Sequence, residues 1–168
     1  MRIPLSAKDR FRKGLFSKWD PDKRPEKWLA RLPRYVVRDT SPRGKVVLDA
    51  GTGTKARFAI AFAKAGAERV VAMDISPPLI KMAREEAKRE GVSDRIEFGI
   101  GDMEDLEYGD ERFDIVCCMG TIIHLSYPSK GVSELKRVCK KGGLLVANTA
   151  MTEKPIRGNY WQTFTEDE

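Results

Sequence analysis

Two acids and two glycines have the types and spacing to hold a small ligand. Asp49 ends the apolar run VVLD, and Gly51, Thr52 and Gly53 follow after one alanine. A glycine turn between a strand and a helix lets the backbone come close to a ligand and leaves free amides at the helix N-terminus. Asp74 ends the next apolar run, near the spacing at which an acid accepts hydrogen bonds from a ribose. The pattern predicts a site for a ligand that contains a nucleoside.

Three interpretations of this glycine stretch are open. Gly51–Ala56 reads GxGxxA, which together with Asp74 is typical of a dinucleotide site and of an NAD(P)-binding oxidoreductase. Asp49 argues against that interpretation, because a carboxylate beside a pyrophosphate is repelled. Beside a ligand that carries an ammonium and a sulfonium, the same carboxylate is favoured. The third interpretation is a turn that binds nothing.

His124 is the candidate for proton transfer. It is the only histidine in the chain and comes six residues after Cys118, which ends the run FDIVCC. An imidazole titrates near neutrality, which suits a general base beside an acceptor; the alternative is a histidine packed at a helix start. Asp102, Glu104 and Asp105 share one short loop with no second ligand group nearby, so no metal site is predicted.

Short apolar runs alternate with helix-like segments from residue 45 onward. This alternation predicts an α/β fold, a doubly wound and mostly parallel sheet with helices on both faces. Ligands bind beyond the carboxyl ends of such strands, which is where the acids and His124 fall. Ser76-Pro77 predicts a helix start, and Gly91 and Gly142 predict helix ends. The predicted strands are 45–50, 69–75, 95–102, 113–120 and 143–150, and the predicted helices are 54–65, 76–90 and 130–140.

The motifs also follow the order of a known enzyme family. Asp-x-Gly-x-Gly at 49–53 is followed by VVAMDIS, IGDMEDL, FDIVCCMGTIIHL and ELKRVCKKGGLLV. In this order they resemble the class I S-adenosylmethionine (SAM) methyltransferases, in the branch that acts on small molecules, over roughly residues 44–149. The resemblance implies that SAM is the cofactor and that a small molecule accepts the methyl group.

The resemblance also implies the contacts of SAM. They are Asp49, Gly51, Thr52 and Gly53 at the methionyl end, Asp74 at the ribose hydroxyls, Ile75 against the adenine, Asp102 at its amino group, the Met103 backbone at its ring edge and Cys118 in the pocket wall. One departure lies in the glycine loop, where Lys55-Ala56 stands in place of a single glycine.

A second departure concerns length. The family sheet has seven strands, and this sequence contains no segment for strands six and seven, so residues 143–148 would form an exposed apolar edge. That edge could pair in a homodimer or be capped by the aromatic residues that follow it. A longer native chain is the favoured alternative, because TFTEDE reads as a helix start.

Positive charge is concentrated ahead of the first predicted strand. The 168 residues carry a net charge of +6, to which the first 45 contribute +9 and the remainder −3. We expect residues 1–44 to form a basic helical lid anchored by Trp19 and Trp28, with Pro33 bending or dividing its helix, and residues 45–168 to form the SAM-binding domain. A solvated basic helix pair is the alternative. Nucleic acid is a less favoured partner, because no Asn-Pro-Pro-Tyr stretch follows strand four.

Composition bounds the class of protein. No apolar run reaches the ~18 residues of a membrane span, and the start lacks the apolar centre of a signal peptide. The three cysteines have no metal spacing, which favours a reducing compartment. Taken with what the family resemblance implies, the prediction is a cytoplasmic SAM-dependent methyltransferase with a small-molecule acceptor. The alternatives are an NAD(P)-binding oxidoreductase and a non-catalytic SAM-binding module.

Overall fold

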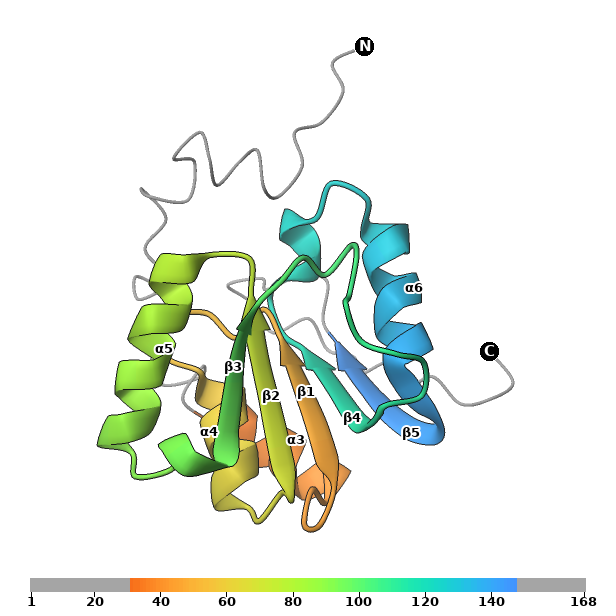
Figure 1. Ribbon diagram of the computed structural model, residues 1–168. Coiled ribbons are helices and arrows are strands. Elements are labelled where there is room, and N and C mark those ends of the chain that lie inside the picture. The colour runs from red at the N-terminus through yellow and green to blue at the C-terminus, as the bar shows by residue number, and fades with distance from the viewer. Residues whose placement is uncertain (1–30, 148–168) are drawn as a thin grey trace.

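One parallel sheet of five strands forms the centre of the fold. The structure is a computed structural model, and it describes residues 31–147. The strands lie in the order β3-β2-β1-β4-β5, and every neighbouring pair is parallel (Figure 1). The α/β class and the parallel sheet predicted from the sequence are confirmed. The strands are β1 (Val46–Ala50), β2 (Arg69–Asp74), β3 (Ile96–Ile100), β4 (Phe113–Cys118) and β5 (Cys139–Ala147).

Helices cover both faces of the sheet. Helices α3, α4 and α5 lie on one face and α6 lies on the other (Figure 1). Successive side chains of a strand point to opposite faces, so a strand inside the sheet contributes to two cores. In β1, Val47 packs on the side of α3, α4 and α5, and Leu48 packs on the side of α6. The helices are α3 (Leu32–Thr40), α4 (Arg57–Lys64), α5 (Pro77–Arg89) and α6 (Pro128–Val138), with the short 3-10 helices η2 (Ser93–Arg95) and η3 (Ile122–His124).

The helix ends follow the local sequence in two cases and depart from it in a third. Ser76 Oγ accepts a hydrogen bond from the Leu79 amide at 3.4 Å and so caps α5, as predicted. Gly91, with φ +70°, follows the end of α5, as predicted. The prediction that Gly142 ends a helix was wrong. Helix α6 already ends at Val138, and Gly142 takes φ +69° inside β5, where the register with β4 shifts.

Helix α3 begins next to Pro33. The proline lies in the first turn of α3, where its missing amide hydrogen costs no bond. The earlier part of the helix that Pro33 was predicted to bend or divide lies outside the described residues. Leu32 and Val36 are buried, which fixes α3 on the sheet. Trp19 and Trp28, the predicted anchors of the lid, lie outside the described residues.

The side chains of β5 correct the prediction of an exposed apolar edge. Within residues 31–147, β5 pairs with β4 alone. Leu145 is nevertheless 3% exposed and Val146 is 7% exposed. Leu145 packs on the α6 side and Val146 on the opposite side. Helices therefore cover these side chains from both faces. Positions 148–150, also predicted as strand, lie outside the described residues.

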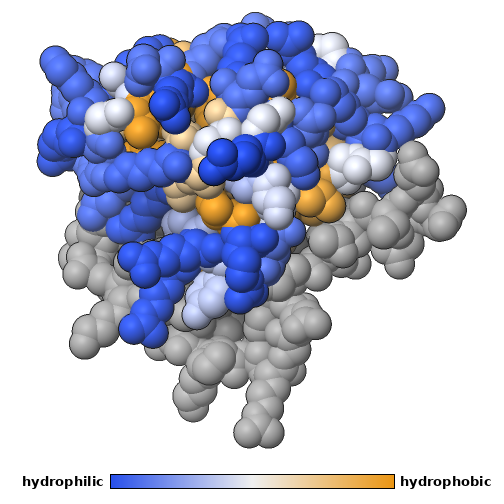
Figure 2. All heavy atoms as spheres, turned by 90° about the horizontal axis from the view of Figure 1, so that it is seen from below, coloured by the Kyte–Doolittle hydropathy of each residue, from blue (hydrophilic) through white to orange (hydrophobic). Residues whose placement is uncertain are grey.

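The amino ends of the strands form a charged face. Figure 2 shows the molecule from this end, mostly hydrophilic with small hydrophobic areas. Arg69 forms an ion pair with Glu97, and Lys140 pairs with Asp114 at 2.7 Å. Exposed pairs of this kind are typical of a solvated surface. The buried acids near the glycine loop lie at the opposite end of the sheet.

Two classes of feature are missing from residues 31–147. None of their helices has the length and apolar character needed to cross a membrane. The same residues also contain no group of three or more His, Cys, Asp or Glu side chains placed to hold a metal ion.

Candidate active site

The glycine loop leaves β1 where the strand order of the sheet reverses. β1 lies between β2 and β4, and ligands of doubly wound sheets bind at this position. The amides of Gly51 and Thr52 both donate to the Met73 oxygen, at 2.8 and 2.9 Å, so the loop is fixed to the end of β2. Gly51 and Gly53 take φ values of +82° and +65°, in the left-handed region that glycine tolerates.

The two glycines differ in what surrounds them. A Cβ atom on Gly51 would lie 2.1 Å from Thr121 Oγ1, so the loop after β4 packs directly on this glycine. Thr121 Oγ1 also donates to the Gly51 oxygen at 3.3 Å. A Cβ atom on Gly53 would meet nothing within 4 Å in the described part of the chain. Gly53 therefore borders open space that a ligand can fill.

Asp74 holds the far end of the glycine loop. Asp74 is 9% exposed, and its carboxylate accepts from the Gly53 amide at Oδ2 and from the Ser76 amide at Oδ1, both at 3.1 Å. Burial raises the pKa of Asp74, and the amide hydrogen bonds counter that shift. A carboxylate oxygen has room for more than one hydrogen bond. Asp74 can therefore accept from ribose hydroxyls while it positions Gly53.

Asp49 lies beneath the loop and reaches α4. It is 1% exposed, and its Oδ2 accepts from the Thr52 hydroxyl at 2.7 Å and from the Ala59 amide at 3.1 Å. The Ala59 amide belongs to the first turn of α4, and the N-cap residue Ala56 has no side chain that can accept from that turn. Asp49 supplies this cap. Burial raises its pKa to about 6.

Ala56 adopts the backbone conformation expected of the glycine that Lys55-Ala56 replaces in the loop. It takes φ 41° and ψ 39°, the left-handed conformation that glycine adopts most readily, and it is fully buried. The alanine therefore keeps the backbone shape expected of a glycine and adds a methyl group to the core on the α4 side. Lys55, the other residue of the departure, is partly exposed.

The predicted adenine contacts form one tight turn after β3. Asp102 Oδ1 accepts from the Glu104 amide at 2.9 Å, and the Asp102 oxygen accepts from the Asp105 amide at 3.0 Å. Met103, between them, is 4% exposed, and its Sδ lies 3.5 Å from Cys118 Sγ. Cys118 is fully buried, and burial raises its pKa to about 12. Its side chain is a neutral core group, which leaves only its backbone to line a pocket.

Apolar surface borders Asp74. Ile75 follows it directly and is partly exposed. Ile100 is the register partner of Asp74 in β3 and is 60% exposed. Ligand pockets combine such apolar side chains with a few polar groups.

The loop after β4 brings His124 to the same end of the sheet. Thr121 begins this loop with its contact to Gly51, and η3 carries His124, whose amide donates to the Thr121 oxygen at 2.9 Å. His124 is half-buried, and its Nε2 atom is buried. The structure therefore brings the candidate base and the glycine loop together through Thr121, a residue that the sequence did not single out.

Glu104 connects the turn at residues 102–105, called the adenine turn below, to the end of the loop after β4. Its Oε1 accepts from the Ser126 amide at 2.6 Å and from the Tyr127 amide at 3.1 Å. The Glu104 side chain is 6% exposed. In the sequence it was only a weak metal candidate, and nothing in the pattern shows that its carboxylate turns inward.

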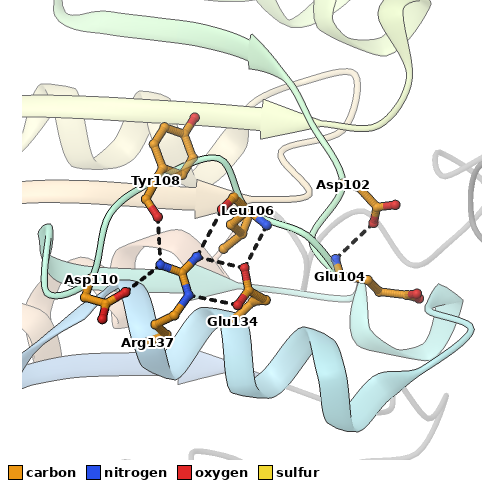
Figure 3. Close-up of polar contacts among 7 residues, drawn as sticks. All are labelled: Asp102, Glu104, Leu106, Tyr108, Asp110, Glu134 and Arg137. Atoms are coloured by element: carbon orange, nitrogen blue, oxygen red, sulfur yellow. Dashed lines mark hydrogen bonds and ion pairs between the residues drawn. The ribbon is translucent and has the colours of Figure 1, made fainter.

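A second set of contacts fastens the loop between β3 and β4 to α6 (Figure 3). Arg137 donates to the Tyr108 oxygen at 2.8 Å and to the Leu106 oxygen at 3.0 Å, and it forms ion pairs with Glu134 and Asp110. Glu134 also accepts from the Leu106 amide at 2.8 Å. The hydrogen bonds from Arg137 lower the pKa of Glu134. The loop that carries the turn at residues 102–105 is therefore held against α6 from Leu106 to Asp110.

Known proteins share this arrangement. Residues 48–147 match the family described as "Methyltransferase domain". Demethylmenaquinone methyltransferase of Bacteroides fragilis is 35% identical over 123 residues, which cover 73% of this chain and 49% of the relative, so the chain spans about half of that protein. A SAM-dependent methyltransferase structure from Aquifex aeolicus is 27% identical, covers 83% of this chain and 79% of its own, and has a TM-score of 0.65.

The fold itself is shared more widely. The structure of the [4+2]-cyclase SpnF has a TM-score of 0.74 and covers 88% of this chain and 62% of its own, but at 23% identity this likeness shows the fold alone. The family match carries more weight, because it spans most of the chain and includes all the candidate residues from Asp49 to His124. The chain belongs to the methyltransferase-domain family.

Proposed function

We propose that the chain binds SAM at the carboxyl ends of β1, β2 and β3 and transfers its methyl group to a small-molecule acceptor. The observation that carries this proposal is the pair of buried acids on one glycine loop, Asp49 through the Thr52 hydroxyl and Asp74 through the Gly53 amide. Asp74 suits the ribose of either ligand, but Asp49 does not: a ligand with a sulfonium and an ammonium is attracted to the Asp49 carboxylate, whereas a pyrophosphate is repelled. This charge argument disfavours the NAD(P)-binding alternative.

The residues present fit the groups of SAM. Gly53 borders open space, Asp74 retains acceptor capacity for ribose hydroxyls, and the surface of Ile75 and Ile100 suits the adenine. The Asp102 turn follows β3 at the same end of the sheet. When bound, SAM supplies an activated methyl group. The chain's own residues then have to hold the donor and fix where the acceptor can approach.

Methyl transfer from a sulfonium is a displacement that depends mainly on proximity and alignment. Thr121 packs on Gly51 and so fixes the loop after β4 against the glycine loop. His124 lies in that loop, where it is the candidate to take a proton from the attacking group of the acceptor. In this proposal Thr121 positions the base and His124 acts on the acceptor.

The acceptor class is proposed from relatives. The Bacteroides fragilis relative is named a demethylmenaquinone methyltransferase, and a ring compound of the quinone type is the first acceptor to test. The chain spans about half of that relative, so the acceptor of the relative is a hypothesis for this chain and not a property of it.

Calorimetric titration of the 168-residue chain with SAM, S-adenosylhomocysteine and NAD⁺ tests the cofactor. We expect the two sulfur ligands to bind and NAD⁺ not to bind; tighter binding of NAD⁺ would overturn the proposal. Transfer of a labelled methyl group to demethylmenaquinone and other small ring compounds then tests turnover. Binding of SAM without transfer to any of them would favour a non-catalytic SAM-binding module.

The proposal extends to the rest of the chain. The lid was expected over residues 1–44, but α3 within that range packs on the sheet through Leu32 and Val36. The lid role is therefore proposed for residues 1–30, and their deletion should abolish turnover while much of the SAM affinity remains. The three free cysteines favour the cytoplasm as the site of action. A homodimer through the free side of β5 would continue the sheet, and light scattering tests it.

A further inference from the structure

A buried carboxylate outside the predicted contacts links the two halves of the site. Glu104 follows Asp102 and Met103 directly, yet its Oε1 accepts hydrogen bonds from two amides more than 20 residues away, those of Ser126 and Tyr127. These amides precede α6 and end the loop that carries His124. We propose that Glu104 is a positioning residue, which transmits binding of the donor's adenine to the loop that faces the acceptor.

Packing around Glu104 supports a rigid link. Met103 is 4% exposed, and a Cβ atom on Gly131 of α6 would lie 3.9 Å from Met103 Cγ and 2.3 Å from Leu125 Cδ1. The adenine turn, the end of the loop after β4 and the start of α6 therefore share one packed contact. An anion at this point is favoured in addition by the N-terminus of α6.

The carboxylate is suited to this role because it is buried and accepts from two amides at once. Charge-assisted hydrogen bonds are roughly twice as strong as neutral ones. A ligand that restrains residues 102–104 also restrains Glu104, and with it the Ser126 and Tyr127 amides. Coupling between two sites is reciprocal, so the factor by which bound adenine restrains the loop is also the factor by which the restrained loop strengthens adenine binding. Loss of Glu104 should therefore remove the restraint and weaken adenine binding by the same factor.

The inference rests on the proposed function, since it requires an adenine at the Asp102 turn. Hydrogen–deuterium exchange of the full chain, with and without S-adenosylhomocysteine, tests it without any acceptor. In the wild-type chain we expect the ligand to slow exchange at Ser126 and Tyr127 by about 5-fold or more, the lower end of usual couplings between sites. Glu104→Gln should reduce this protection, and Glu104→Ala should remove it and weaken the affinity for the ligand by a similar factor.

Two control variants separate coupling from general loosening. Glu107→Gln changes an exposed acid on the same loop and should leave the protection intact. Glu134→Gln loosens the loop at Leu106 without touching the bonds of Glu104, so it should speed exchange near residue 106 and keep the protection at Ser126 and Tyr127.

The outcomes distinguish failure of the proposed function from failure of the role of Glu104 alone. Failure of the wild-type chain to bind S-adenosylhomocysteine would reject the proposed function, and the role of Glu104 with it. Binding without protection at Ser126 and Tyr127 would reject the role of Glu104 alone. Equal protection in the wild-type chain and in Glu104→Ala would also reject it, because the ligand would then restrain the loop by another route.

Discussion

Thr121 fills the space above Gly51 so closely that a Cβ atom on the glycine would lie 2.1 Å from its Oγ1 and 2.7 Å from its Cβ. The two residues belong to the loops that follow β1 and β4, the neighbouring strands at the centre of the sheet. Their contact sets the distance between the loop that holds the donor and the loop that carries His124. It requires glycine at position 51 for a steric reason as well as for its φ of +82°.

Substitution of the two glycines should therefore have unequal effects. Gly53→Ala meets no neighbouring atom in the described residues and should cost only the strain of a left-handed alanine, ~1–2 kcal/mol in the free energy of unfolding. Gly51→Ala adds an overpacking penalty of typically ~1–3 kcal/mol. Denaturant unfolding measures both.

A double variant checks the cause of that difference. Thr121→Gly removes the atoms that a Cβ on Gly51 would meet, so Gly51→Ala should cost less in the Thr121→Gly background than in the wild-type chain. Strictly additive effects would show that the clash with Thr121 does not decide the cost of Gly51→Ala.

Loss of Asp74 should weaken cofactor binding strongly. The carboxylate is expected to accept from both ribose hydroxyls, and charge-assisted bonds of ~1.5–3 kcal/mol each put the loss of binding free energy in Asp74→Ala at ~2–4 kcal/mol after partial compensation by water. The variant also removes the acceptor for the Gly53 amide, which should loosen the glycine loop. Calorimetry with S-adenosylhomocysteine measures the affinity.

The control for Asp74 is Asp94→Asn, which changes an exposed acid in η2. It should leave the affinity unchanged. Wild-type affinity in Asp74→Ala would reject the assignment of Asp74 as the ribose acceptor.

Local signals predicted much of the fold. The alternation of apolar runs and helical segments predicted the five strands, and Ser76 predicted the start of α5. The prediction that Gly142 ends a helix failed because a glycine in the left-handed conformation is equally suited to a helix end and to a strand bulge. Only the packing of β5 against β4 decides between the two, and that packing is not local.

The candidate site was predictable only where its residues follow strands directly. Asp49 and Asp74 end β1 and β2, so their place at the carboxyl edge of the sheet follows from topology. Thr121 and Glu104 were missed, because their partners Gly51, Ser126 and Tyr127 are distant in sequence and are brought near by tertiary packing alone. Binary patterns carry no information on such contacts.

Arg137 should control the order of the loop between β3 and β4. Arg137→Met keeps the apolar stem but removes the donors to Leu106 and Tyr108 and the partner of Glu134. We expect several-fold faster amide exchange in residues 105–110 and weaker binding of S-adenosylhomocysteine. Arg137→Lys should be intermediate, because an ammonium keeps the charge but cannot reproduce the planar fork of a guanidinium.

The matched control for Arg137 is Lys88→Met, which removes an exposed cation from α5. Exchange in residues 105–110 should be unchanged in this variant. If Arg137→Met also left that exchange at the wild-type rate, the contacts drawn in Figure 3 would not be what holds the loop.

Asp49 should give the chain an unusual dependence of stability on pH. Burial raises its pKa from an ordinary 3.8 to about 6, so the folded state binds this proton more tightly than the unfolded state does. Stability contributed by the neutral carboxyl is therefore fully present below pH 3.8 and is lost as the pH rises through about 6. A shift of this size corresponds to ~3 kcal/mol in the free energy of unfolding.

Asp49→Asn removes this titration while an amide oxygen can still accept from Thr52 and Ala59. The unfolding free energy of the variant minus that of the wild-type chain should therefore rise between pH 4 and pH 7, by up to ~3 kcal/mol. At pH 7 the variant should also bind SAM more weakly than the wild-type chain, because it lacks the negative charge beneath the donor. Urea unfolding across this pH range and calorimetry at pH 7 measure the two effects.

The raised pKa of Asp74 is common to both chains and cancels in the difference to first order. If the unfolding free energies of the two proteins changed in parallel with pH, ionisation of Asp49 would not destabilise the folded chain. The buried charge of Asp49 would then not connect stability with cofactor binding.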